Sequence, residues 1–173
     1  MNFGMALLIN CSNMERLLDS MFNTMKNYIL VAIFIFIVDR VLKIAALAWC
    51  TDFVYVINSY VTFDVVINRG VSWGLLHSTN DFIFFMVSCA IVIITGALCW
   101  YAYNQYRQGI SILGEICIIA GSVANLTDRL FYSGVVDFIV LSYKNWFWPV
   151  FNIADVAIVI GTSIVMFQQI KRP

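Results

Sequence analysis

The sequence predicts an all-α membrane protein with four transmembrane helices and a small extracytoplasmic β-cradle formed by the first outer loop. The chain has 173 residues, of which 62% are hydrophobic and only 12% are charged. That charged fraction is about half of what an ordinary soluble domain carries, and the mean hydropathy is +0.87. Four apolar stretches each approach the ~20 residues that a helix needs to cross a bilayer. These observations place the chain among small multi-pass membrane proteins.

The four predicted spans differ in the charges that they contain. They cover residues 28–50, 82–103, 110–126 and 151–170. The first carries Asp39, Arg40 and Lys43, the second has no charge, the third is interrupted only by Glu115, and the fourth has Asp155 near its start. None of the spans alternates as a barrel strand does, so helices are the structures that satisfy the backbone in lipid.

Lysine and arginine residues outside the spans indicate the orientation. With the N-terminus inside, the inner side holds Arg16, Lys26, Arg107, Lys171 and Arg172, and the outer side holds Arg69, Arg129 and Lys144. This excess favours both termini in the cytoplasm, and an even number of spans agrees with placing both termini on one side.

Two connections lie on the predicted outer side. In the first, residues 54–57 and 60–67 are rich in β-branched and aromatic side chains, which predicts short strands on the membrane surface. The turn residues 68–70 follow. In the second, residues 129–150, Trp146 and Trp148 suggest an interfacial aromatic belt.

The chain divides into an N-terminal extension and one membrane domain. Residues 27–173 contain all four spans, and residues 1–26 precede them. The extension has apolar residues at helical spacing, which is typical of a short interfacial helix. Alternatively, it is an upstream extension and Met25 is the functional start.

Three aspartates fall near the outer edge of the predicted bundle: Asp128, Asp137 and Asp155. An ionised carboxylate in an apolar setting is costly, so each is a functional candidate. Hydrolysis by carboxylates requires two that share a proton, one ionised and one protonated. The apolar neighbours of Asp137 suit a carboxyl with a high pKa, whereas Arg129 and Asn125 favour an ionised, structural Asp128. We therefore predict that Asp137 and Asp155 form the pair and that Asp128 braces them.

Each aspartate also has a plainer interpretation. Asp128 is then a hydrogen-bonding residue at a helix end, Asp137 an interfacial loop carboxylate, and Asp155 a complement to a helix dipole. Asp39 and Lys43, four residues apart, are expected to form an ion pair that neutralises both inside the membrane. Lys43 alternatively contacts lipid phosphates or substrate.

Other classes of site are not indicated. The formal net charge is zero, so nothing points to nucleic acid. The five cysteines form no Cys-x-x-Cys motif and there is one histidine, so we expect neither a metal nor another cofactor.

Four sequence blocks together resemble a known family. They are Asp39-x-x-x-Lys43; Asn68-x-Gly70-x-x-Trp73-Gly74; Gly121-x-x-x-Asn125-x-x-Asp128-Arg129 continuing to Gly134-Val-Val-Asp137-Phe138; and Phe151-Asn152-x-Ala154-Asp155. In these blocks, which span about residues 28–170, the chain resembles the bacterial lipoprotein signal peptidases, or signal peptidase II. The resemblance departs at Arg40, where the family often has glutamine, and at Ala124, where glycine is common.

The resemblance implies an aspartic endopeptidase of the bacterial inner membrane that removes signal peptides from prolipoproteins. Its substrates are diacylglyceryl-modified precursors, cut before the modified cysteine, at a site facing the outer side among membrane lipids. Asp137 and Asp155 match the catalytic positions. The binding and supporting positions match Asp39, Lys43, Asn68, Gly70, Asn125, Asp128, Arg129, Asn152 and Ala154. Two other functions stay open on the residues alone: a small cation or proton transporter, and a non-catalytic subunit for lipoprotein assembly.

Overall fold

The structure, a computed structural model, describes residues 3–51, 53–70, 80–144 and 146–170, with side chains from residue 24 onward. Trp73 and Gly74 of the second sequence block lie outside the described residues. The elements in chain order are α1 (Phe3–Trp49), β1 (Tyr55–Val56), β2 (Val61–Asn68), α2 (Asp81–Arg107), α3 (Leu113–Tyr132), β3 (Val135–Tyr143), β4 (Trp146–Phe147) and α4 (Ile153–Ile170). The described chain is thus mostly helical with a small antiparallel sheet.

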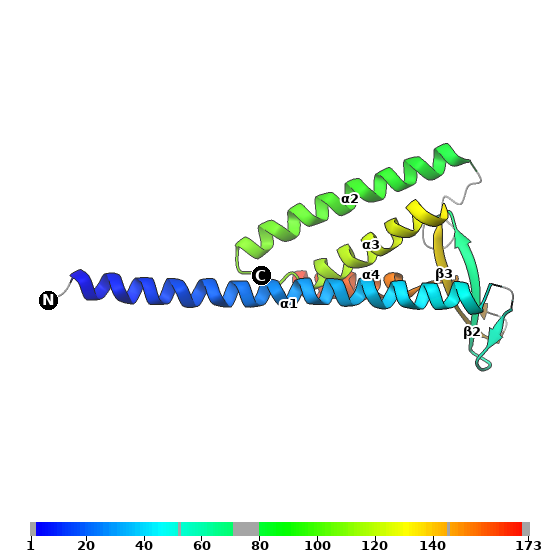
Figure 1. The fold of residues 1–173 in the computed structure, drawn as a ribbon, viewed down its shortest axis with the longest axis horizontal. Coiled ribbons are helices and arrows are strands. Elements are labelled where there is room, and N and C mark those ends of the chain that lie inside the picture. Colours follow the sequence, from blue (N-terminus) through cyan, green and yellow to red (C-terminus); the bar gives the residue numbers. More distant parts are fainter. Residues whose placement is uncertain (1–2, 52, 71–79, 145, 171–173) are drawn as a thin grey trace.

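The sheet lies at one end of the helical bundle (Figure 1). α1 and α3 end there and α2 begins there, whereas the α2–α3 connection and the C-terminus lie toward the opposite end. α1 is a single helix of 47 residues whose N-terminal part extends beyond the other helices. The helix therefore continues without a break across residue 27, and an interfacial position for residues 1–26 stays a prediction.

α3 is the central helix, because it packs against α1, α2 and α4. Its contact with α4 is close enough that only glycine fits at several positions. A Cβ atom on Gly121 would lie 2.5 Å from the carbonyl oxygen of Ala154, and one on Gly161 would lie 2.5 Å from that of Gly114. Small residues let membrane helices approach in this way. The seam fixes the start of α4 against the middle of α3.

The four strands pair in chain order, and every pairing is antiparallel. β2 pairs with β3 so that Asn68 is opposite Val135 and Val66 is opposite Asp137. The sequence interpretation placed the cradle in the first outer loop alone and missed β3. The first residues of β3 are buried on both faces, and a strand of that kind is continuously apolar instead of alternating.

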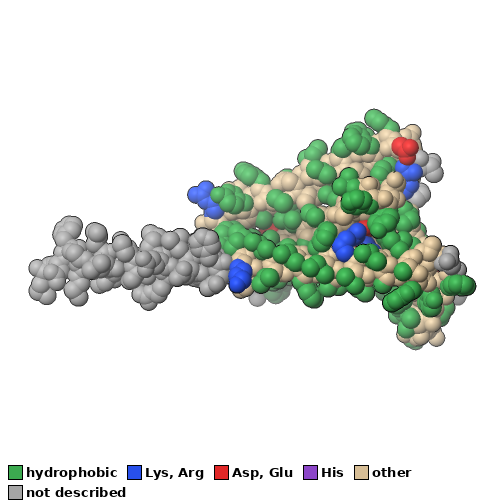
Figure 2. Space-filling view, viewed as in Figure 1, with side chains coloured by type: hydrophobic (Ala, Val, Ile, Leu, Met, Phe, Trp, Pro, Cys, Tyr) green, Lys and Arg blue, Asp and Glu red, His purple; other side chains and the backbone are tan. Residues whose placement is uncertain are grey.

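Two helices, α2 and α4, are long and apolar enough to cross a membrane by length and composition among the described residues. Large apolar side chains of both helices are exposed, including Trp100 and Phe85 on α2 and Val159 on α4. The space-filling view shows a mainly hydrophobic surface over the helices, with few charged side chains (Figure 2). α1 and α3, which were also expected to span, carry charged residues within their apolar stretches.

Candidate active site

Two aspartates from separate elements meet where the sheet joins the helices. Asp137 is the third residue of β3, and Asp155 lies in the first turn of α4. The chain entering α4 runs back along β3, because the Ile139 amide donates to the Phe151 carbonyl at 2.9 Å and the Phe151 amide donates to the Ile139 carbonyl at 3.1 Å. Both aspartates consequently line one cavity of about 470 Å³.

Asn152 and Asp155 form a reciprocal capping box at the start of α4. The backbone amide of Asp155 donates to Oδ1 of Asn152 at 2.9 Å, and the backbone amide of Asn152 donates to Oδ2 of Asp155 at 3.2 Å. This pattern satisfies two amides that a helix start leaves free. The other oxygen of Asp155 accepts from the side-chain amide of Asn125 at 2.9 Å. The Asp155 carboxyl is therefore fixed by donors on both oxygens.

Asp137 is almost completely buried, with 2% of its surface exposed. Its Oδ1 accepts from the side-chain amide of Asn152 at 2.6 Å, and its Oδ2 accepts from that of Asn68 at 2.9 Å. Burial, followed by the negative charge of Asp155, raises the pKa of Asp137 to about 7, although both amides and the charge of Lys43 act in the opposite direction. At neutral pH this carboxyl can hold a proton and give it up.

A cluster of four charged side chains lies beside the pair and joins α1 to α3: Asp39, Lys43 and Asp128 are buried, and Arg40 is partly buried. Lys43 Nζ is 2.9 Å from Asp39 Oδ2 and 2.6 Å from Asp128 Oδ2. It also donates to Oδ1 of Asn125 at 2.9 Å. Arg40 Nη2 is 3.0 Å from Asp39 and 2.5 Å from Asp128 Oδ1. The predicted Asp39–Lys43 pair is present, and it is one edge of a larger, electrically neutral cluster of two acids and two bases.

The two acids of this cluster each hold the backbone next to one aspartate of the pair. Asp39 Oδ1 accepts from the amide of Ala154 at 3.0 Å, and Asp128 Oδ2 accepts from the amide of Val136 at 3.2 Å. Ala154 directly precedes Asp155, and Val136 directly precedes Asp137. The cluster is therefore connected through single residues to both aspartates.

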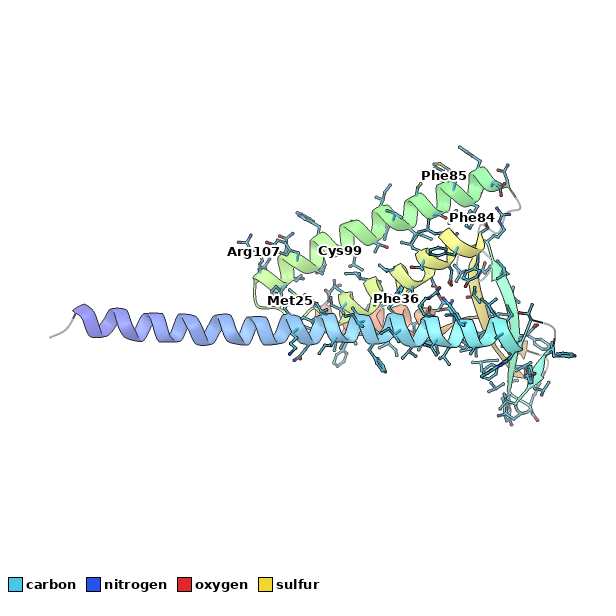
Figure 3. The ribbon with its side chains drawn as sticks, viewed as in Figure 1. Met25, Phe36, Phe84, Phe85, Cys99 and Arg107 are labelled. Carbon is cyan, nitrogen blue, oxygen red and sulfur yellow. The ribbon has the colours of Figure 1, made fainter. Side chains whose placement is uncertain are left out.

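Arg129 points away from Asp128, although the two are neighbours in sequence. Consecutive helical residues face directions about 100° apart, so the two side chains reach different partners. The Arg129 guanidinium donates to the carbonyl of Gly70 and lies 5.1 Å from the ring of Phe84, which is labelled at the sheet end of α2 in Figure 3. The amide of Gly70 donates to Oδ1 of Asn68 at 2.9 Å. Arg129 thus supports the turn that presents Asn68 to the site.

The cavity has a small polar region and a larger apolar wall. Asn68, Gly70, Asn125, Arg129 and both aspartates form the polar region. Apolar side chains come from α2, α3, β3 and α4, including Ile91, Leu126, Leu141 and Val159. Such a lining suits a substrate that is mainly hydrocarbon and carries one reacting polar group. Among the described residues, no three His, Cys, Asp or Glu side chains are grouped as a metal site would need.

Comparison with known proteins gives the family. Residues 31–171 match the family described as signal peptidase (SPase) II. The chain belongs to the signal peptidase II family. The protein named lipoprotein signal peptidase from Clostridium novyi is 32% identical over 140 residues, covering 79% of this chain and 93% of that protein. Its namesake from Pseudoalteromonas atlantica is 27% identical over 147 residues, covering 84% and 90%.

Two solved structures of bacterial membrane enzymes are similar in fold. A bacterial membrane enzyme determined by the in meso method at 2.3 Å has 30% sequence identity and a TM-score of 0.66, over 84% of this chain and 88% of that chain. A second one at 1.9 Å has 30% identity and a TM-score of 0.63, over 85% and 94%. Membership of the signal peptidase II family makes the chain an aspartic peptidase of prolipoproteins.

Every predicted site residue lines the cavity, belongs to the charge cluster or makes one of the amide hydrogen bonds just described. Sequence reasoning missed the participation of Arg40 in the cluster, which it treated only as a departure from the family pattern. No local pattern could have revealed it, because its distant partner Asp128 is 88 positions further along the chain (128 minus 40).

Proposed function

We propose that Asp137 and Asp155 are the catalytic pair with which this chain cleaves prolipoproteins before the diacylglyceryl-modified cysteine. The observation that carries the proposal is their placement on one largely apolar cavity, where Asp137 has a pKa of about 7. Two adjacent carboxyls share one proton most readily, because like charges at close range cannot both ionise. Asp137 is the member that holds this proton at neutral pH.

The pair then performs peptide hydrolysis with balanced proton transfers. A water molecule attacks the scissile carbonyl carbon and gives its proton to ionised Asp155, while the proton of Asp137 passes to the carbonyl oxygen. Collapse of the resulting diol returns a proton to the leaving nitrogen as the carbon–nitrogen bond breaks. Asn152 touches both carboxyls, and Asn68 and Asn125 each touch one. These amides keep the carboxyl oxygens aimed at the reacting atoms.

We further propose that all four helices span the bacterial inner membrane, with the termini in the cytoplasm and the sheet at the outer face. The charges of α1 and α3 are compatible with spanning because Asp39, Arg40, Lys43 and Asp128 pair with each other. In this arrangement the sheet forms an extracytoplasmic cradle. The apolar wall of the cavity receives the acyl chains of the precursor and lies next to membrane lipids.

Cleavage of a diacylglyceryl-modified precursor by the purified chain tests the function. Release of the signal peptide is expected from the lipidated precursor and not from an unlipidated control. Asp137→Asn and Asp155→Asn are each expected to lower kcat by at least ~100-fold. Asp64→Asn, on the half-buried part of β2, is the matched control and should retain activity.

Each contrary result points to a different conclusion. Undiminished turnover in either variant of the pair contradicts the assignment, and loss confined to Asp128→Asn would mean that the pair was chosen wrongly. Precursor binding without cleavage would favour an assembly subunit. Ion flux in liposomes without cleavage would favour a transporter.

A further inference from the structure

Arg40 completes the charge cluster in a way that Lys43 cannot. The three N–H groups of Lys43 already face Asp39, Asp128 and Asn125. Oδ1 of Asp128 is therefore left to Arg40, whose Nη2 is the cation within ion-pair distance of it among the described side chains. Without Arg40, the Asp128 carboxylate would keep Lys43 as its counter-ion, but Oδ1, which is buried and accepts no hydrogen bond among the described residues, would lose its ion pair.

The guanidinium also bridges two helices. Its Nη2 contacts Asp39 on its own helix, Asp128 on α3 and the carbonyl of Ala124 at 3.4 Å. Since Asp39 holds the amide of Ala154 and Asp128 holds that of Val136, the spacing of these two acids sets the spacing of the two catalytic aspartates.

The charge balance around Asp137 depends on Arg40. Toward the sheet end, the elements around Asp137 carry these charged groups: Asp155 on α4; Asp39, Arg40 and Lys43 on α1; Asp128 and Arg129 on α3; and Asp64 and Arg69 on and after β2. Within the cluster itself, two carboxylates face two cations, so the net charge is zero. Loss of Arg40 leaves one net negative charge beside the catalytic pair.

We propose that Arg40 is a positioning residue for the reaction: together with Lys43 it ties Asp39 to Asp128, and thereby holds the catalytic aspartates at their working separation in neutral surroundings. This inference rests on the proposed catalytic pair. The position of Arg40 is energetically unfavourable in one respect, because its Nε is buried without a hydrogen-bond partner. A role in stability alone would not require a side chain that leaves such a group unsatisfied.

The test compares Arg40→Gln and Arg40→Lys with Arg107→Gln. Arg107 is a matched control: its guanidinium lies 5.9 Å from the Tyr103 ring, as that of Arg40 lies 5.9 Å from the Phe36 ring. Figure 3 labels Phe36 in the half of α1 nearer the sheet and Arg107 at the end of α2 farthest from the sheet. The kcat, the KM and the pH profile of precursor cleavage are measured for each full-length variant in lipid.

Arg40→Gln is expected to lower kcat about tenfold with KM changed less than about twofold, because the catalytic groups shift while the cavity wall stays. Its pH profile should move toward alkaline pH by about half a unit, since a net negative charge favours protonated Asp137. Arg40→Lys retains the charge but spans less distance, so the wild-type pH profile should return with only part of the kcat. Arg107→Gln should match wild type in all three quantities.

Several outcomes would overturn the inference. One is a Gln variant with wild-type kcat and pH profile; another is a Gln variant whose kcat falls only in proportion to its folded fraction, with an unchanged profile. If the Gln variant does not fold, the Lys variant is decisive. A wild-type kcat in the Lys variant refutes the role of Arg40 in linking Asp39 to Asp128. A reduced kcat at an unchanged pH optimum supports that role. No cleavage by wild type refutes the proposed function and this inference together, whereas normal wild type with an unaffected Gln variant refutes only the role of Arg40.

Discussion

Replacing Asp137 by asparagine is expected to abolish cleavage and yet to stabilise the folded protein above pH 7. The side chain keeps its size, but it can no longer ionise in its buried position. Activity and stability should therefore change in opposite directions at the same residue. Such a trade-off is expected where a catalytic group is held in an unfavourable environment.

The magnitude follows from the pKa of Asp137, which burial and the charge of Asp155 raise from 3.8 to about 7. Because the folded state binds this proton more tightly than the unfolded state, the resulting stabilisation is complete below pH 3.8 and is lost as the pH rises through 7. At about 1.4 kcal/mol for each pKa unit, the loss above pH 7 is roughly 4 kcal/mol. Asparagine avoids that loss.

The substitution also has a cost. The Asn68 and Asn152 side-chain amides both donate to the carboxyl, and the new amide nitrogen must face one of these donors. An unsatisfied buried donor costs about 1–3 kcal/mol. The variant should thus be about 1–3 kcal/mol more stable than wild type above pH 7 and less stable than wild type below about pH 5, where wild type keeps its proton.

Thermal unfolding of both proteins in one detergent, from about pH 5 to about pH 9, measures this difference. For a chain of this size, 1 kcal/mol corresponds to a Tm shift of about 2–4 °C. Asp64→Asn, which replaces a carboxyl outside the cavity lining, is the control for the same chemical change. A Tm difference between Asp137→Asn and wild type that stays constant across the pH range would refute the reasoning.

Three further predictions concern the helix seam, the brace and the pH dependence of cleavage. Gly121→Ala would place a Cβ 2.5 Å from the carbonyl oxygen of Ala154, so it should destabilise the fold by about 1–3 kcal/mol and reduce kcat. The control is Gly96→Ala, whose Cβ would meet no neighbouring atom within 4 Å. In the same unfolding and cleavage assays it should lower neither the stability nor kcat. Asp128→Asn breaks the ion pairs of Asp128 with Arg40 and Lys43, so it should lower the stability of the fold by about 3–5 kcal/mol, measured by Tm at neutral pH. A decrease in stability below about 1 kcal/mol would contradict the supporting role of Asp128. Wild-type kcat should fall as the pH rises above about 7, where Asp137 loses its proton, and a profile that stays flat to about pH 9 would exclude Asp137 as the proton donor.

Local patterns in the sequence predicted those features that depend on one element. The uncharged run of α2 predicted a helix, and the four-residue spacing of Asp39 and Lys43 predicted their ion pair, which is present at 2.9 Å. Asn125 and Asp128, three residues apart, share one helix face, since both contact Lys43. These outcomes follow from helix geometry alone.

Features that depend on packing between elements were not predictable in the same way. β3 was missed because its buried start lacks the alternation that marks a half-exposed strand. The ion pairs of Asp128 with Lys43 and Arg40 were not predicted, because they join residues of two different helices. Arg40 meets Asp128 only after α1 has packed on α3. Interhelical contacts of this kind have no signature in a single sequence.

The glycines between α3 and α4 and the buried charges have different roles in this fold: packing of the helices and positioning of the two aspartates. Gly114, Gly121 and Gly161 bring α3 and α4 together through backbone contact, which supplies packing without any charge. The charge cluster instead lies at the start of α4 and the start of β3, where Asp39 and Asp128 hold the amides before Asp155 and Asp137. Buried ion pairs add little net stability compared with apolar side chains of the same volume. Their placement is therefore better explained by geometry: they fix two carboxyls that would otherwise repel each other at the end of a helical bundle.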